Sequence, residues 1–132
     1  MKTSKKTLLK LVNSILIIIT SYFLLHIALI LNLIPYAFFW GGKINSLSQL
    51  YLFESLALVI LVFIGVTTII RRKQLINTAK ATPLIKRMML VFSIFFILNS
   101  IGNLLAETML EKCQTVITLY LAMAFYRLNK SI

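Results

Sequence analysis

The amino-acid sequence predicts an all-α protein, a four-helix transmembrane bundle whose two termini are both cytoplasmic. Three observations support this fold class. Hydrophobic residues make up 60% of the 132-residue chain, and the mean hydropathy is +0.95. Charged residues make up only 13%, whereas about a quarter of the residues in a soluble domain are charged. The apolar residues gather in four long runs, and the 14 Lys and Arg residues lie mostly on one side of them.

The basic residues are divided unequally between the connections of this bundle. Four precede the first apolar run, six lie between the second and third, and two follow the fourth. Only Lys43 and Lys112 fall in the other two connections, so the division is 12 to 2. Because cytoplasmic loops are enriched in Lys and Arg, both termini are expected in the cytoplasm. Residues 1–132 are expected to cross a bacterial inner membrane as a single domain. The localisation predicted is therefore the cell membrane, with multiple passes.

The first helix is predicted at about residues 11–33, with Pro35 beyond its end. A helix needs about 20 apolar residues to cross the hydrocarbon core. The stretch from Val12 to Leu31 is almost continuously apolar, whereas the apolar part of a secretory signal has about 7 to 15 residues. We therefore expect a retained signal-anchor helix.

Three further helices are predicted at about residues 50–70, 88–106 and 110–128. The second is expected to stop at the basic run of residues 71–73. The fourth is the weakest candidate membrane span because its first turns contain three polar residues, Glu111, Lys112 and Gln114. It requires a packed or water-filled outer end.

The connection between the first two helices is rich in aromatic residues and then in glycine. Residues 34–43 read Ile-Pro-Tyr-Ala-Phe-Phe-Trp-Gly-Gly-Lys. Tyr and Trp favour the membrane boundary, where an apolar ring lies in lipid and its polar atom reaches water. The simplest interpretation is an interfacial belt, and the alternative is that Trp40 belongs to a lid or ligand surface.

Residues 71–87 are expected to form the only cytoplasmic loop, with a short amphipathic helical continuation that ends before Pro83. Each Lys or Arg near an anionic leaflet contributes about 1 kcal/mol of attraction. Nucleic acid is not an expected partner, because the basic residues flank apolar runs and no nucleic-acid-binding module is visible. Anionic lipid headgroups are the predicted partners of six residues: Arg71, Arg72, Lys73, Lys80, Lys86 and Arg87.

Polar residues inside the predicted spans lie at similar depths in the outer half of the bundle. His26 falls about 8 to 10 Å from the outer end of the first helix, and Glu54 about 6 Å from that of the second. Asn103 lies near this level on the third helix, with Asn99 one turn deeper and Glu107 one turn shallower. The sequence thus predicts a polar layer.

The third helix carries a face of small and amide side chains. Asn99, Gly102, Asn103 and Ala106 are spaced i, i+3, i+4 and i+7, so they share one face, which is expected to look inward. Small residues allow a neighbouring helix to approach closely, and amides hydrogen-bond across the contact at about 0.6 kcal/mol each. The simplest interpretation of the two Asn residues is that they stabilise helix packing.

Glu54 is the polar residue that most needs explanation, because a carboxylate near hydrocarbon needs a partner, a proton or water. One possibility is structural, a hydrogen bond to His26 or to an Asn amide. The other is that Glu54 and His26 form a protonatable pair that binds a cation or the polar head of a lipid-like ligand. The ligand-site hypothesis therefore comprises His26, Glu54, Asn99, Asn103 and Trp40.

No metal site, cofactor site or catalytic motif is predicted. One His, one Glu and two Asn fall short of the three or four good ligands of a zinc site. The single Cys113 excludes an intrachain disulfide and a Cys-x-x-Cys motif. Glu107 and Glu111 are interpreted as solvated loop charges that make the outer mouth acidic.

Residues 34–43, Phe53-Glu54 and the run from Asn99 to Ala106 resemble those of small, uncharacterised bacterial four-span integral membrane proteins. The resemblance covers most of the chain and implies a four-span fold, without supplying an activity. The chain also has the size of small multidrug-resistance transporters. Their acidic residue in the first helix is absent, and the polar residue in that helix is His26.

Three classes of function follow from these observations. The first is an accessory or structural membrane protein whose bundle binds a protein partner or a second copy of the chain. The alternative is a protein that binds or transports a lipid-like or cationic ligand at the outer-leaflet polar site around Glu54 and His26. A membrane enzyme that acts on lipid, with His26 and Glu54 as an acid/base pair, requires the most assumptions.

Overall fold

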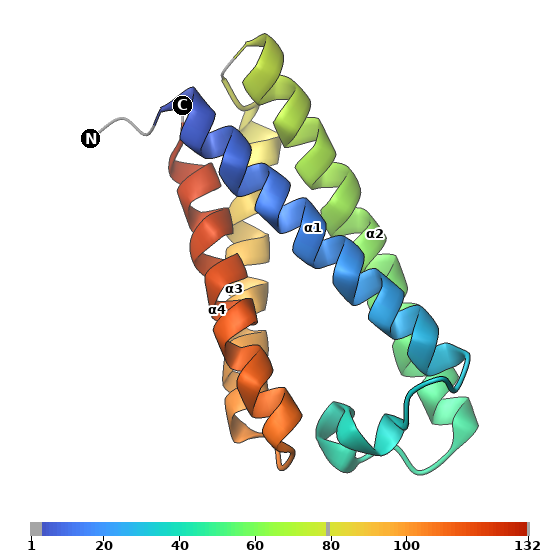
Figure 1. Cartoon of the computed structure of the whole chain (residues 1–132). Helices are drawn as coiled ribbons and strands as arrows, with labels where there is room; N and C mark the ends of the chain where they lie inside the picture. The colour runs from blue at the N-terminus through green and yellow to red at the C-terminus, as the bar shows by residue number, and fades with distance from the viewer. Residues whose placement is uncertain (1–3, 79, 132) are drawn as a thin grey trace.

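The computed structural model describes residues 4–78 and 80–131, and these residues form four long helices without strands. In chain order the helices are α1 (Lys5–Ile30), α2 (Leu47–Asn77), α3 (Pro83–Leu105) and α4 (Met109–Lys130) (Figure 1). Two short 3-10 helices, η1 (Tyr36–Phe38) and η2 (Trp40–Gly42), lie between α1 and α2. The prediction of an all-α fold with four helices is confirmed.

Helix α1 begins earlier and ends earlier than expected. The hydroxyl of Ser4 caps its first turn and accepts a hydrogen bond from the backbone N–H of Thr7, so the helix includes the basic residues before the apolar run. At the other end, Asn32 adopts a φ of 55°, and the N–H of Leu33 bonds to the carbonyl of Ala28. This Schellman-type ending stops the helix before Pro35.

Helix α2 continues past the basic run at residues 71–73, so the expected stop there is wrong. Lys and Arg are good helix formers, and charge alone does not end a helix. Helix α3 in turn begins at Pro83, the first helical position, where the missing N–H of proline costs nothing. The predicted cytoplasmic loop of residues 71–87 is therefore mostly helical, and the connection between α2 and α3 is short.

Three of the helices, α1, α2 and α3, are long and apolar enough to cross a membrane, which suggests a multi-pass membrane protein. Helix α4 is not among these candidate spans. It packs antiparallel along α3, and three residues connect the two helices (Figure 1). Phe92 and Phe96 of α3 contact Phe125 of α4, with ring centroids 5.4 and 5.7 Å apart.

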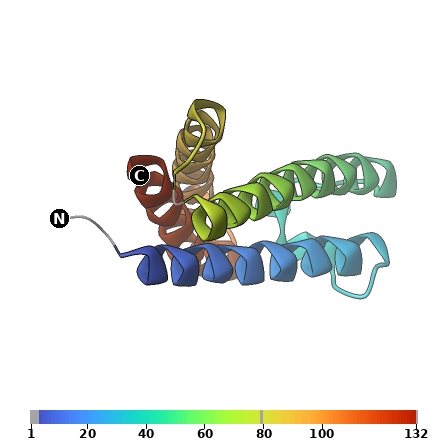
Figure 2. The ribbon, with the colours of Figure 1, turned by 90° about the horizontal axis from the view of Figure 1, so that it is seen from above.

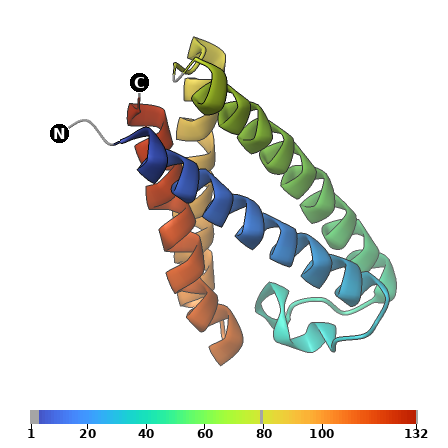
Figure 3. The same ribbon diagram turned by 45° about the horizontal axis from the view of Figure 1, so that its top comes forward.

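The four helices form two hairpins, α1–α2 and α3–α4, which meet at one end and separate at the other (Figures 1 and 3). The terminal end is where α1 begins and α4 ends, and the distal end holds η1, η2 and the α3–α4 connection. Seen from above, α1 and α2 run away from the other pair (Figure 2). The main core includes Val12, Ile15, Leu75, Met89 and Leu128, so the hairpins are held together near the terminal end.

Arg71 lies inside this terminal junction and is fully buried. Its Nη2 donates a 2.7 Å hydrogen bond to the hydroxyl of Ser131, beyond the end of α4. The residue follows Ile64, Thr67 and Thr68 along the buried face of α2. The predicted contact between Arg71 and lipid headgroups is therefore wrong, because this face packs against protein. For the other five basic residues that contact remains a prediction.

Candidate binding site at the distal end

Glu54 of α2 is fully buried, and both oxygens of its carboxylate have partners. Nδ1 of His26, on α1, lies 2.5 Å from Oε2. Nε1 of Trp40, in η2, donates a hydrogen bond of 2.6 Å to Oε1. A buried carboxylate is costly unless it is paired and hydrogen-bonded. The two partners meet this need and fix three separate segments of the chain to one another.

Trp40 is held in an unusual backbone conformation. Its φ is 56°, and Gly41 and Gly42 follow with φ values of 64° and 68°. For a residue with a side chain, such left-handed geometry costs about 1 to 3 kcal/mol unless the surroundings enforce it. The indole packs on Phe53, with ring centroids 5.1 Å apart, and donates its N–H to Glu54. These two contacts fix the turn.

A second carboxylate, Glu111 at the start of α4, holds the same turn from the other hairpin. Oε1 accepts the backbone N–H of Gly41 at 2.8 Å, and Oε2 accepts the hydroxyl of Thr108 at 2.8 Å. Thr108 also caps α4 by accepting the N–H of Glu111. Glu111 is thus nearly buried, and its interpretation as a solvated loop charge is wrong. Its carboxylate is stabilised by the helix N-terminus and by backbone and hydroxyl donors.

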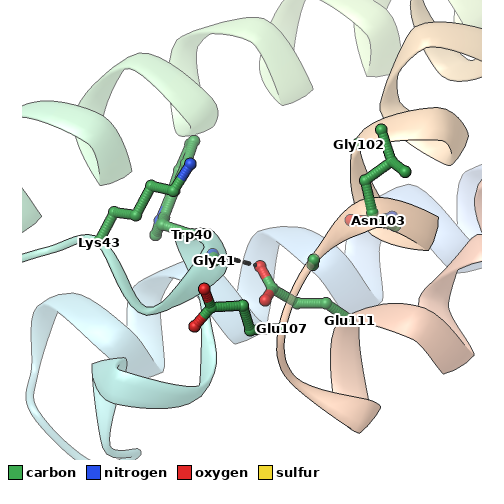
Figure 4. A pocket seen from close by; sticks show the side chains of 9 residues that line it. Trp40, Gly41, Lys43, Gly102, Asn103, Glu107 and Glu111 are labelled. Carbon is green, nitrogen blue, oxygen red and sulfur yellow. Dashed lines mark hydrogen bonds between the residues drawn. The ribbon is translucent and has the colours of Figure 1, made fainter.

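The η2 turn therefore stands between two carboxylates, Glu54 on one hairpin and Glu111 on the other. Beside this turn lies a pocket of about 400 Å³. Figure 4 shows Trp40 and Lys43 on one side of it, Gly102 and Asn103 on the other, and Glu111 between them. The complete lining consists of Trp40, Gly41, Lys43, Gly102, Asn103, Leu105, Ala106, Glu107 and Glu111.

Two charged side chains of this pocket are available to a ligand. Neither the ammonium of Lys43 nor the carboxylate of Glu107 has a hydrogen-bond or ion-pair partner within residues 4–78 and 80–131. Both residues are exposed. In contrast, Glu54 is enclosed behind the turn, and Glu111 already accepts from two donors. The free charge thus lies in the pocket and not in the buried His26–Glu54 pair.

The structure brings some of the predicted site residues together and separates others. His26, Glu54 and Trp40 form one hydrogen-bonded group. Asn103 lines the pocket, and its Nδ2 lies 3.5 Å from Oγ1 of Thr118. Asn99 is exposed on α3 and belongs to neither group.

The expected inward face of α3 is wrong for two of its members, Asn99 and Gly102, which are both exposed. Instead, Phe92 and Phe96 contact Phe125 of α4, and Ser100 donates a hydrogen bond to Thr118 of α4. Ser100 lies one position beyond Asn99, and one residue turns a helix by about 100°. The sequence pattern therefore predicts a face of α3 that lies next to the face that actually contacts α4.

Sequence reasoning missed Lys43, Gly41 and Glu111 as members of the site. A signal for Glu111 is present, because Thr108-x-x-Glu111 matches the capping-box pattern at a helix start. The bond from Gly41 to Glu111 spans 70 residues and has no local signature.

The donor set at this end does not resemble a metal centre. Within the part of the chain that the structure describes, no group of three or more His, Cys, Asp or Glu side chains could hold a metal ion. The polar groups that line the pocket are an ammonium, two carboxylates and an amide. Such groups recognise polar and charged parts of a ligand by hydrogen bonds and charge.

Comparison of the chain with protein-family models, with curated proteins and with solved structures finds no match.

Proposed function

We propose that this protein is a four-span protein of the bacterial inner membrane that binds an amphipathic ligand, without catalysis, in its distal pocket. Both termini lie in the cytoplasm in this proposal, so the pocket opens at the outer leaflet.

The topology is supported by the charge division together with the packing of α4. Of the 12 basic residues on one side, the 11 that the structure describes all fall at the terminal end of the fold. Helix α4 lies along α3, which is a candidate membrane span (Figure 1). In this proposal α4 therefore crosses the membrane beside α3. The polar first turn of α4 is tolerable because Glu111 accepts the N–H of Gly41 in η2 and the hydroxyl of Thr108, so neither polar side chain needs to face lipid.

The observation that carries the binding function is the turn at Trp40 and Gly41, which two buried carboxylates hold between the separated hairpins. The turn supports one wall of a pocket that combines free charges with apolar surface from Trp40, Leu105 and Ala106. Small-molecule sites combine an apolar lining with a few placed polar groups and have volumes of about 300 to 1,000 Å³. The pocket of about 400 Å³ falls within this range of volumes, and its lining contains groups of both kinds.

A substitution that fills the pocket tests this function. A Cβ on Gly102 would meet nothing within 4 Å, so Gly102→Trp is expected to fold and occupy the pocket. Val116→Trp is the matched control, because Val116 is exposed on α4 and does not line the pocket. The purified full chain in dodecyl maltoside is mixed with a bacterial polar lipid extract, and retained lipid is measured by native mass spectrometry.

The wild type and Val116→Trp are expected to retain lipid, and Gly102→Trp to lose most of it. Equal retention by all three proteins would contradict binding in the pocket. Unfolding of Gly102→Trp would show in its circular dichroism, and Ala106→Phe then serves as a second pocket-filling variant.

A second candidate function is that of a partner-binding bundle, which the exposure of Asn99 favours. The side-chain amide of Asn99 makes no hydrogen bond with any described residue. The neighbouring residues Leu98 and Ile101 are also exposed. Amides on membrane-spanning helices hydrogen-bond across helix contacts. A photo-crosslinking residue at position 99 should give a discrete adduct in cells, whereas the same residue at position 59, exposed on α2, should not.

A further inference from the structure

The unpaired charges in the distal pocket are of opposite sign. Lys43 supplies an ammonium and Glu107 a carboxylate, and they do not form an ion pair with each other. The remaining pocket carboxylate, Glu111, accepts the N–H of Gly41 and the hydroxyl of Thr108. The pocket therefore presents one free cation and one free anion within its described lining.

This pair of charges distinguishes between kinds of ligand. A purely anionic ligand would gain from Lys43 but would lie near both Glu107 and Glu111. A purely cationic ligand would gain from Glu107 and leave Lys43 without a partner. A zwitterion satisfies both free charges, and charge-assisted hydrogen bonds are about twice as strong as neutral ones.

The chemistry of the neighbouring groups indicates which zwitterion fits. Nδ2 of Asn103 has two N–H groups, and one of them donates to Oγ1 of Thr118, so one donor remains on the side of the pocket opposite Lys43 (Figure 4). An ammonium and an amide N–H together suit the oxygens of a phosphate. The Glu107 carboxylate accepts hydrogen bonds, so it favours a primary ammonium, which has N–H donors, over a quaternary one, which has none.

The rim of the pocket indicates where an apolar tail would leave. Leu105 lines the pocket and is 78% exposed. Leu98, Ile101 and Leu104 are exposed along the preceding turns of α3. This apolar track leads from the pocket toward the middle of the candidate span, where acyl chains would lie.

We propose that the ligand is a phosphoethanolamine zwitterion, with its phosphate at Lys43 and Asn103 and its ammonium at Glu107. This proposal rests on the proposed function of the pocket. The same headgroup chemistry occurs in a phosphatidylethanolamine lipid and in free phosphoethanolamine, and the apolar track favours the lipid.

The sole tryptophan of the chain, Trp40, lines the pocket and provides a direct readout. The full chain in dodecyl maltoside is titrated with short-chain phosphatidylethanolamine, phosphatidylcholine, phosphatidylglycerol and free phosphoethanolamine while the tryptophan emission is followed. Phosphatidylethanolamine is expected to shift the emission at concentrations about tenfold lower than the other three ligands, which corresponds to about 1.4 kcal/mol.

Two variants test the assigned charges. Lys43→Gln and Glu107→Gln are each expected to weaken phosphatidylethanolamine binding about tenfold and to reduce the preference over phosphatidylcholine or phosphatidylglycerol. Lys112→Gln is the control for loss of one positive charge, because Lys112 is exposed nearby and does not line the pocket. Neither tested side chain has a partner among the described residues, so both variants should fold.

The outcomes separate this proposal from the proposed function. If phosphatidylglycerol binds as tightly as phosphatidylethanolamine, the zwitterion assignment is overturned while lipid binding in the pocket stands. If free phosphoethanolamine binds as tightly as the lipid, the lipid source is overturned and the headgroup chemistry stands. If no ligand changes the emission and the Gly102→Trp variant retains lipid, both proposals fail.

Discussion

The indole N–H of Trp40 donates a 2.6 Å hydrogen bond to the carboxylate of Glu54, and this bond fastens the α1–α2 connection to helix α2. The second oxygen of the same carboxylate is paired with His26 of α1. One buried side chain thus ties together both helices of the first hairpin and the turn between them. The two hydrogen bonds explain how a carboxylate is accommodated in a candidate membrane span. The bond from Trp40 also explains why the Trp40 backbone holds a left-handed conformation.

Removal of the indole N–H should destabilise the fold. Trp40→Phe keeps an aromatic ring on Phe53 but leaves Oε1 of Glu54 without its donor. An unsatisfied buried polar group costs about 1 to 3 kcal/mol, and the free energy of unfolding in detergent should fall by this amount. In the Glu54→Leu background the same substitution should cost clearly less, because the acceptor is absent. Equal costs in the two backgrounds would contradict a coupling between Trp40 and Glu54.

Alanine substitutions at Gly41 and Gly102 should have different effects on the stability of the fold. Gly41→Ala places a side chain at a φ of 64°, which costs about 1 to 2 kcal/mol. Gly102→Ala lies inside α3 with open space around its Cβ, and alanine is a better helix former by about 0.8 to 1 kcal/mol. Thermal unfolding followed by circular dichroism should place Gly41→Ala below and Gly102→Ala at or above the wild type. The reverse order would contradict the left-handed turn.

Two neighbouring cations of α2 should contribute unequally to stability. Arg71 is buried and donates to Ser131, whereas Lys73 is exposed. Arg71→Gln should lower the free energy of unfolding by more than about 1 kcal/mol, and Lys73→Gln should change it by less than about 0.5 kcal/mol. Chemical denaturation of both variants checks this difference. Similar effects would indicate that Arg71 has no stabilising role in the terminal junction.

The single cysteine allows a direct test of orientation. Cys113 is exposed in the first turns of α4, near the distal end. With the termini in the cytoplasm, a membrane-impermeant maleimide should label Cys113 in intact cells. A Cys113→Ser protein that carries Lys73→Cys should react only after permeabilisation. Labelling in the opposite pattern would invert the proposed topology and place the pocket on the cytoplasmic side.

The polar residues show how far the sequence predicts the site. Their depth follows from counting residues along each helix, which placed His26 and Glu54 near one level, and the two side chains are indeed in contact. The direction of each side chain around its helix was harder to predict. In a soluble helix the apolar stripe marks the core, but both the lipid side and the core side of a membrane helix are apolar. The amide and small residues from Asn99 to Ala106 share one face, but their spacing does not give its direction, and Asn99 is exposed although it is expected to look inward.

The sequence by itself determined the all-α class, the four helices, the unequal distribution of charge and the level of the buried carboxylate, because each depends on composition and counting along the chain. Only the tertiary structure decided that Trp40 and Glu111 hold one turn between the hairpins, that Arg71 is internal and that Lys43 and Glu107 stand unpaired around a pocket. These features depend on contacts between residues up to 70 positions apart. Such contacts are set by the angle at which the hairpins separate, for which no local pattern in the sequence exists.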